Sequence, residues 1–282
     1  MSPEVGQYGA MTATLTPQQR RARFFELHAR QEVFVMPNPY DVGSAKMLAN
    51  AGFPALATTS AGLAWTLGVD DGDVTFDQLL AHVSAVSSAV DAPLNVDSER
   101  LFAEDLAGVA ANVEALHRAG AAGCSIEDWN PATEAIDPVG AAAERVAAAA
   151  EAAHVAGDPL VLTARCENFL HGITVLDETI ARLSAYRDAG ADCVYAPGLS
   201  TAEQIKTVVD AVGVPVNVLA WPTGPSVSEI GNAGGRRVST GSALASTAFG
   251  ALMVGARELL ETGTSSYLKV RLQPEDRAAL RS

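Results

Sequence analysis

Short apolar runs rich in branched side chains recur along the chain, separated by longer polar stretches. Runs of this length, bounded by turn residues, are typical of buried β-strands. Eight such runs are present: VFVM (33–36), PALATT (54–59), PLNV (93–96), AGCSI (122–126), LVLTA (160–164), DCVYA (192–196), PVNVL (215–219) and RRVST (236–240). The pattern therefore predicts eight strands.

The segments between these runs have helical spacing or consist of strong helix formers. Examples are DVGSAKMLANAG, TFDQLLAHVSAVSSAV, EDLAGVAANVEALHRAG, PVGAAAERVAAAAEAAHVAG, DETIARLSAYRDAG and TAEQIKTVVDAVG. Several of them end in glycine, which helix C-termini prefer. The phrases NAGFPAL, RAGAAGCS and DAGADCVY each pass from a helix end through glycine into the next strand. Strands and helices are therefore expected to alternate.

This alternation predicts a parallel sheet, and the count of eight favours closure into a (β/α)8 barrel. An open doubly wound sheet is the alternative, although no G-x-G-x-x-G follows the first strand. A helix over 17–31 precedes the first strand and is expected to plug the bottom of the barrel. We expect an N-terminal tail over 1–16, one barrel domain over 17–262 and a C-terminal extension over 263–282.

Composition narrows the function classes. The formal net charge of -14 argues against nonspecific binding to nucleic acid or to anionic membranes. Cys124, Cys166 and Cys193 are odd in number and lie in or beside apolar runs, so we expect core residues rather than disulfides or a zinc site. The N-terminus has no secretory pattern, and ASTAFGALMVGA (245–256) is expected to form a buried helix because it is too short to span a bilayer. The expected location is cytoplasmic.

Polar residues follow the predicted strands, at the end where (β/α)8 barrels carry their chemistry. They are Asn38, Tyr40 and Asp41 after the first; Ser60, Ala61 and Gly62 after the second; Asp97 and Glu99 after the third; Glu127 and Asp128 after the fourth; Arg165 and Glu167 after the fifth. Residues i and i+2 of an extended strand share a face, so Asp97 and Glu99 are expected to converge, as are Arg165 and Glu167.

Several acids at one barrel mouth repel one another unless a cation compensates them. Carboxylate oxygens without histidine or cysteine suit Mg²⁺, with Mn²⁺ as an alternative. The competing interpretation is that these acids form ion pairs with lysines or arginines at the rim. The glycine-containing turn TSAGLAWTLGVDDGD (59–73) offers backbone N–H groups near Ser60 to a carboxylate or phosphate, and Arg165 adds a cation with bidentate reach.

Taken together, these segments resemble the isocitrate lyase/phosphoenolpyruvate mutase superfamily. The resemblance runs from about Met36 to Gly250 and depends on a set of fragments in the family's order. They are PNPYDVGSAKMLANAGF, TTSAGLAWTLGVDDGD, PLNVDSE, AGCSIED, LTARCENFLHG and YRDAGADCVYAPGL.

The resemblance implies a Mg²⁺-dependent barrel that acts on 2-oxo or 2-hydroxy carboxylates and cleaves C–C bonds or handles C–P bonds. It implies that Asp97 contacts the metal, while Asp71, Glu99 and Glu127 hold its waters. It also implies that Ser60, Ala61 and Gly62 bind the substrate carboxylate, that Arg165 clamps the substrate and that Glu167 lies beside it. Family members usually form tetramers, dimers of dimers that exchange a late helix, so we expect a homo-oligomer.

The loop after the fourth strand departs from the family's carbon–carbon lyases. Those enzymes carry a proton-donating cysteine in a K-[KR]-C-G-H motif, whereas this chain reads EDWNPATEAIDP. The mutase and phosphonopyruvate hydrolase branches use lysine, asparagine or threonine there, and Asn130 and Thr133 are the candidates here. Trp129 suggests an apolar lid.

Four further residues have two interpretations each. Arg100 either enters the site or forms an outward salt bridge, and we favour the salt bridge. His171 is either a proton carrier or a surface or capping residue. Tyr40 and Trp65 either line the pocket or pack in the core, and we expect only Tyr40 to line it.

The sequence thus predicts a lyase that forms an enolate from a small carboxylate by retro-aldol cleavage or decarboxylation. Decarboxylation suits the loop best, because its departing group needs no proton. The alternatives are a C–P bond enzyme and a non-catalytic carboxylate-binding barrel.

Overall fold

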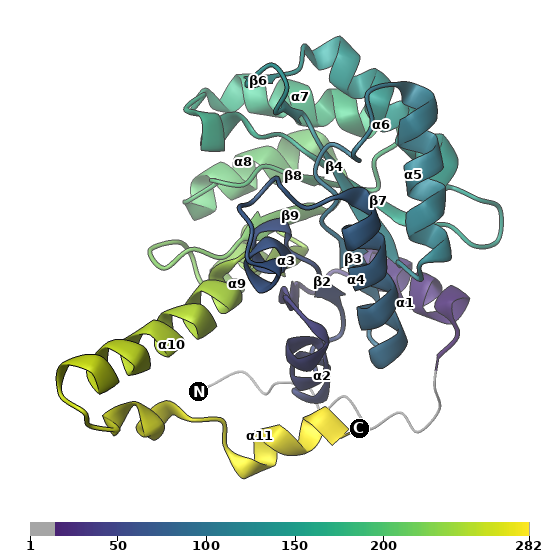
Figure 1. The fold of residues 1–282 in the computed structure, drawn as a ribbon. Coiled ribbons are helices and arrows are strands. Elements are labelled where there is room, and N and C mark those ends of the chain that lie inside the picture. Colours follow the sequence, from purple (N-terminus) through teal and green to yellow (C-terminus); the bar gives the residue numbers. More distant parts are fainter. Residues whose placement is uncertain (1–14, 282) are drawn as a thin grey trace.

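A computed structural model describes residues 15–281, so the predicted N-terminal tail lies, up to residue 14, outside the described residues. Its central feature is one parallel sheet with strand order β1-β10-β9-β8-β7-β4-β3-β2. Figure 1 shows this sheet at the centre of the molecule. The strands are β1 (Phe34–Met36), β2 (Leu56–Ala57), β3 (Leu94–Val96), β4 (Gly123–Glu127), β7 (Val161–Arg165), β8 (Cys193–Tyr195), β9 (Val216–Leu219) and β10 (Arg237–Ser239). All eight predicted strands are present.

The sheet curls until its two end strands, β1 and β2, meet at a seam. There the Ala57 N–H donates to the Pro37 carbonyl over 3.1 Å, and the Asn38 side-chain amide donates to the Thr58 carbonyl over 2.7 Å. Asn38 also joins β1 to the end of β10, because its Oδ1 accepts from the Thr240 and Gly241 N–H groups. The fold is therefore the predicted (β/α)8 barrel rather than an open doubly wound sheet.

Helices surround the sheet (Figure 1). They are α1 (Pro17–Ala29), α2 (Val42–Asn50), α3 (Ser60–Leu67), α4 (Phe76–Ala89), α5 (Leu106–Arg118), α6 (Val139–Ala153), α7 (Leu176–Asp188), α8 (Ala202–Val212), α9 (Val227–Asn232), α10 (Ala243–Glu261) and α11 (Pro274–Ala278). Short 3-10 turns cover Asn168–His171, Ser266–Val270 and Ala279–Arg281, and a small hairpin joins β5 (Trp129–Asn130) to β6 (Ala135–Ile136). Local sequence sets many helix starts: Thr75 and Gln78, for example, form a reciprocal capping box at α4.

Helix α1 covers the N-terminal ends of the strands, as predicted. Phe24 is fully buried in a cluster with residues at the strand starts, including Phe34 and Val161. Arg20 donates to the Val90 carbonyl over 2.9 Å, and Arg21 forms an ion pair with Asp158 over 2.5 Å. Helix α1 therefore ties together the loops that enter the barrel from below.

The two faces of the sheet differ in polarity, because side chains alternate along each strand. Outward residues such as Leu94, Ile126, Leu162 and Val218 belong to the large apolar cluster that packs against the helices. The inward residues are mostly polar: Asn95, Ser125, Thr163, Asn217, Arg237 and Ser239.

All three cysteines are free and buried. Burial raises the pKa of Cys124 to about 12 and also raises the pKa of Cys166 and of Cys193. The prediction that they are core residues is confirmed.

Helix α10 differs from its prediction. The apolar stretch was expected to be buried, but only Ala245 and Gly255 of this helix are, and Leu252, Val254 and Leu260 are exposed. Figure 1 shows the helix extending away from the barrel. Its 19 residues also suffice by length and hydropathy to cross a membrane, which is weak evidence on its own. After α10 the chain folds back on Glu258, which accepts hydrogen bonds from Thr264, Ser266 and Tyr267.

Candidate active site

A cavity of about 260 Å³ opens at the C-terminal ends of the strands. Nearly every strand contributes to its wall through its last residues or the loop that follows. Its polar lining comprises Asn38, Thr58, Thr59, Ser60, Asp71, Asn95, Asp97, Ser125, Thr163, Arg165, Tyr195, Asn217, Arg237, Ser239 and Ser242, with Trp221 and Leu170 among the larger apolar contributions. This is the end of the barrel where the sequence predicted the site.

Arg165, the last residue of β7, is the centre of a charged cluster. Its Nη1 lies 2.6 Å from Asp97 Oδ1 and 3.1 Å from Glu127 Oε2, and its Nε lies 3.0 Å from Glu167 Oε1. Burial works against this charge, but Glu167, Glu127 and Asp97 outweigh it and raise the pKa of Arg165. Arg165 and Glu167 thus converge as predicted, and the rim ion pairs of the competing interpretation are also present.

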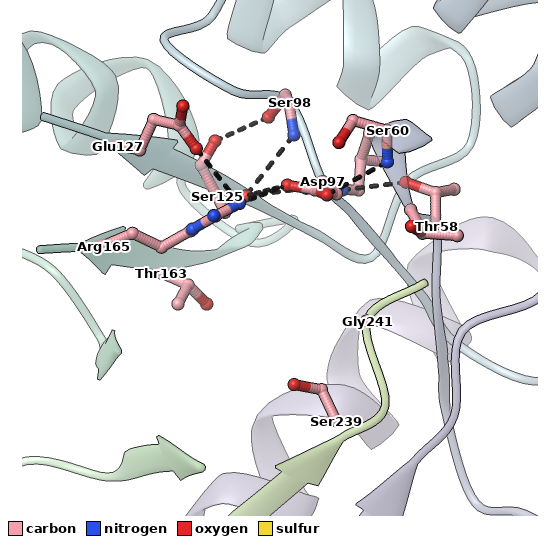
Figure 2. A network of polar contacts seen from close by, with 12 residues as sticks. Thr58, Ser60, Asp97, Ser98, Ser125, Glu127, Thr163, Arg165, Ser239 and Gly241 are labelled. Carbon is pink, nitrogen blue, oxygen red and sulfur yellow. Dashed lines mark hydrogen bonds and ion pairs between the residues drawn. The ribbon is translucent and has the colours of Figure 1, made fainter. Parts of the chain in front are cut away.

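Asp97 lies between Arg165 and the start of α3 (Figure 2). Its Oδ2 accepts from the Ser60 N–H over 3.1 Å, and its own N–H donates to Thr58 Oγ1 over 2.8 Å. Ser125 Oγ on β4 is 3.5 Å from Oδ1. The carboxylate is therefore held from α3, β4 and β7, and Thr58, just after β2, holds the Asp97 backbone.

Glu99 lies near Asp97 because the chain turns after β3, and not because the two residues share one face of an extended strand. Strand β3 ends at Val96, and Glu99 has φ 47°, so the i and i+2 argument for an extended strand is wrong here. The chain turns sharply and the Glu127 N–H donates to the Glu99 carbonyl over 3.0 Å. Burial, followed by the charges of Asp97 and Asp71, raises the pKa of Glu99 to about 7.

The loop after Glu99 is strained and tightly held. Leu101 and Phe102 also have positive φ values, 61° and 49°, which L-residues rarely adopt. Arg145 on α6 donates to the carbonyls of Arg100 and Ala103 over 2.8 and 2.7 Å. A cation from a neighbouring helix therefore fixes the loop that carries Glu99.

The segment 59–73 was predicted to be a turn, but its first part is helix α3. Thr59 caps it, and its Oγ1 accepts from the Gly62 N–H over 3.4 Å. A Cβ at Gly62 would lie 2.4 Å from Thr59 Cγ2, so this glycine serves close packing and does not line the cavity. Ser60 and Ala61 do line it.

Asp71, in the loop after α3, lines the cavity as well. Burial raises the pKa of Asp71, a hydrogen bond from the Ser60 hydroxyl opposes that shift, and the charge of Asp97 adds to it. Asp71 and Glu99 therefore share with Asp97 a negative field that Arg165 only partly offsets.

Besides Gly62, two further residues that were predicted to bind substrate, Tyr40 and Asn130, lie outside the cavity lining. Tyr40 packs on Phe249 of α10, with ring centroids 6.3 Å apart, as does Trp65. Asn130 donates to Asp137 over 3.2 Å in the loop after β4. Arg100 also pairs with Asp137, over 2.8 Å, which confirms its predicted outward salt bridge.

Asp128 supports the site from behind. It is buried, accepts from Tyr186 Oη over 2.5 Å and from the Glu167 N–H over 2.8 Å, and lies 3.3 Å from Arg182 Nη1. It thus points away from the cavity and fixes the backbone of Glu167.

Sequence reasoning missed Tyr195 and Trp221. The Arg165 guanidinium carbon lies 5.5 Å from the centre of the Tyr195 ring, and Trp221 lines the cavity. Each stands at or just after the end of a predicted strand, and that position was the available signal. Trp129 and His171, in contrast, stack on each other with ring centroids 3.5 Å apart and planes at 10°, joining the loops after β4 and β7.

The donor set around Asp97 fits a hard divalent cation held partly through water. The carboxylates supply oxygen only, which such cations prefer, and Mg²⁺ characteristically keeps several waters. Within residues 15–281, no three His, Cys, Asp or Glu side chains converge as a complete metal-ligand set. The fit therefore rests on the chemistry of the donors: Asp71, Asp97 and Glu99 supply only oxygen, and the charges of Asp97 and Asp71 raise the pKa of Glu99.

The fold and the cavity at its C-terminal end define the class of protein: a (β/α)8 barrel with an acidic site at the C-terminal ends of its strands. The sequence profile of the phosphoenolpyruvate phosphomutase family matches residues 24–260. The chain belongs to this family and is an enzyme of the isocitrate lyase/phosphoenolpyruvate mutase superfamily.

Individual relatives agree with this membership. The oxaloacetate decarboxylase of Paraburkholderia xenovorans LB400 is 32% identical over 220 residues, which cover 74% of this chain and 71% of that protein. A Burkholderia cenocepacia J2315 structure, assigned only as far as lyase/mutase, is 43% identical with a TM-score of 0.89, covering 94% of this chain and 95% of that one. A 2,3-dimethylmalate lyase structure is 25% identical with a TM-score of 0.81, covering 93% and 94%.

Proposed function

We propose that this enzyme is a divalent-cation-dependent lyase that cleaves a C–C bond of a small 2-oxo or 2-hydroxy carboxylate. The observation that carries the proposal is the convergence on one small cavity of Arg165, a cation, with Asp97 and Asp71. An arginine fork suits a substrate carboxylate, and an acidic field that Arg165 offsets only in part suits Mg²⁺ or Mn²⁺.

Each residue of the mouth then has a role. Arg165, with the Ala61 N–H and the Ser60 hydroxyl, holds the substrate carboxylate, and Glu167 fixes the Arg165 guanidinium through its Nε. Asp97 would hold the cation, and Asp71, Glu99 and Glu127 would hold its waters. When bound, the cation lowers the energy of the negative charge that develops on the α-oxygen during cleavage.

Decarboxylation is the favoured reaction. The segment EDWNPATEAIDP, 127–138, contains no cysteine, lysine or histidine. CO₂ departs without a proton, and the enolate that remains takes its proton from water to give the 2-oxo acid. The oxaloacetate decarboxylase relative supports this choice. C–P chemistry is the second candidate, favoured by a Burkholderia cenocepacia J2315 structure assigned as a phosphonomutase, 32% identical with a TM-score of 0.80 and covering 88% of this chain and all of that one. A carboxylate-binding barrel without activity is the third.

The assembly proposed with this function is a cytoplasmic homotetramer, a dimer of dimers. The exposed apolar face of α10 supports it, because a second copy of the chain would cover Leu252, Val254 and Leu260. Light scattering after size-exclusion chromatography tests it: four chains per particle are expected, and a monomer would contradict the proposal.

The function is tested by proton and phosphorus NMR on the enzyme with Mg²⁺ and a panel of acids. The panel contains oxaloacetate, alkylated malates, methylisocitrate and phosphonopyruvate. We expect a 2-oxo acid to appear with the intact enzyme and not with Asp97→Ala, while Asp73→Ala, an exposed neighbour of the site, remains active. Phosphate or phosphoenolpyruvate as product would move the assignment to C–P chemistry, and oxalate binding without any turnover would support the third candidate.

A further inference from the structure

A second arginine lies inside the barrel below Arg165. Thr163 and Arg165 both face inward from β7, two residues apart, which separates them along the strand by roughly 7 Å. Arg237, on β10, donates from Nη2 to Thr163 Oγ1 over 3.0 Å and from Nε to Asn217 Oδ1 over 2.8 Å. Its guanidinium therefore lies one layer beneath the mouth, and it lines the same cavity.

The third partner of Arg237 is also neutral. His28 Nδ1 lies 2.8 Å from the Phe24 carbonyl oxygen, so it carries the proton and donates, and Nε2 accepts from Arg237 Nη1 over 3.1 Å. Burial, followed by the charge of Arg237, lowers the pKa of His28 to about 3. His28 is thus an uncharged acceptor.

Arg237 is consequently a buried cation without an anion. It is 1% exposed, and no carboxylate pairs with it among residues 15–281, where its hydrogen-bond partners are Asn217, His28 and Thr163. A buried charge is costly unless it is paired. Its three hydrogen bonds use three of the five N–H groups of a guanidinium, so donors remain for a ligand.

Asn95, opposite on β3, adds a second unsatisfied group. The residue is 4% exposed and lines the cavity, and its Oδ1 has no hydrogen-bond partner. Gly123 on the next strand makes room for it, because a Cβ there would lie 2.9 Å from Oδ1. Because Oδ1 is fully buried and turned toward Gly123, the NH₂ group at the other end of this amide is the part that faces the cavity, where it can donate to an anion.

We propose that Arg237 and Asn95 form an anion subsite inside the barrel that receives the distal carboxylate of a dicarboxylic substrate. This inference deepens the proposed function and rests on it: the reacting end of the substrate lies at Arg165, and its far end lies one layer below. A monocarboxylate leaves Arg237 unpaired, so the barrel selects dicarboxylates.

The test compares racemic malate with racemic lactate, which share the 2-hydroxy acid end and differ in the distal carboxylate. Isothermal titration calorimetry is run on the full chain with Mg²⁺, with oxalate as a third ligand. We expect malate to bind at least tenfold more tightly than lactate. Arg237→Met should reduce this ratio to below about threefold and leave oxalate affinity within about twofold of the parent.

Arg236→Met is the matched control, because it removes the same charge from a residue that faces outward and bonds Gln31; it should keep the full ratio. Arg237→Lys retains the charge and should keep most of the malate-to-lactate affinity ratio. This variant provides the test if Arg237→Met does not fold. An unchanged ratio in Arg237→Met, or a ratio near one in the parent enzyme that still binds oxalate, overturns this inference alone. Binding of none of the three ligands overturns the proposed function, and the inference with it.

Discussion

The outer face of the sheet carries apolar side chains that pack against the helices, whereas the inner face of the same strands carries polar side chains that line the cavity. Leu162 and Thr163 are neighbours on β7, and both are fully buried. Leu162 packs under the helices in the apolar cluster, whereas Thr163 holds Arg237 beside the cavity. The outer face thus supplies most of the apolar burial that stabilises the fold. The inner face can therefore carry polar residues that bind substrate.

Removing Arg165 from the inner face should give the largest effect on activity. We expect Arg165→Met to lower kcat/KM by roughly 10²- to 10³-fold, since it deletes the cation that neutralises charge at the reacting end. The measurement is initial rate on whichever acid of the panel is turned over. Arg165→Lys should recover only part of the loss because lysine has no planar fork, and an Arg165→Met enzyme with parental rates would refute this role.

Truncation on the outer face should instead reduce stability. Leu162→Ala removes a fully buried side chain, so we expect the free energy of unfolding to fall by about 3 kcal/mol. Urea denaturation followed by circular dichroism measures it. The folded fraction should keep its kcat/KM; a large loss of activity at low temperature in folded Leu162→Ala would show that the two faces are not separable.

His28 should give the smallest effect, visible only as a pH dependence. Its folded pKa, about 3, lies below its ordinary value of 6.5, so the unfolded chain binds more protons between these values. Its contribution to stability is complete above pH 6.5 and decreases as the pH falls, by about 1.4 kcal/mol per unit. Unfolding free energies at pH 5 to 8 should show that His28→Gln loses less stability on acidification than the parent; parallel curves would contradict a neutral buried His28.

The sequence was sufficient for most of the framework because strands, helix caps and glycine stops have local signals. All eight strands and the plug helix follow from them, as does the gathering of Asp97, Glu127 and Arg165 at one mouth. The inner polarity was also partly visible, since Asn95 and Thr163 interrupt runs that are otherwise apolar.

The remaining features depend on tertiary contacts. The φ of 47° at Glu99 is imposed by a loop that Arg145 holds from another helix. Tyr40 faces Phe249 of α10 rather than the cavity, and no local pattern encodes that choice. The exposure of α10 likewise has no local signal. An apolar helix has the same sequence pattern whether it packs against its own domain or against a second chain.

The seam between β1 and β2 has a consequence for synthesis on the ribosome. The ladder partner of β1 is β10, and Asn38 at its end bonds Gly241, 203 residues further along the chain. At 5 to 20 residues per second, β1 waits on the order of 10 to 40 seconds for that partner to be made. The nascent barrel therefore grows as an open sheet, and the ladder between β1 and β10 that closes it forms only after β10 has been made.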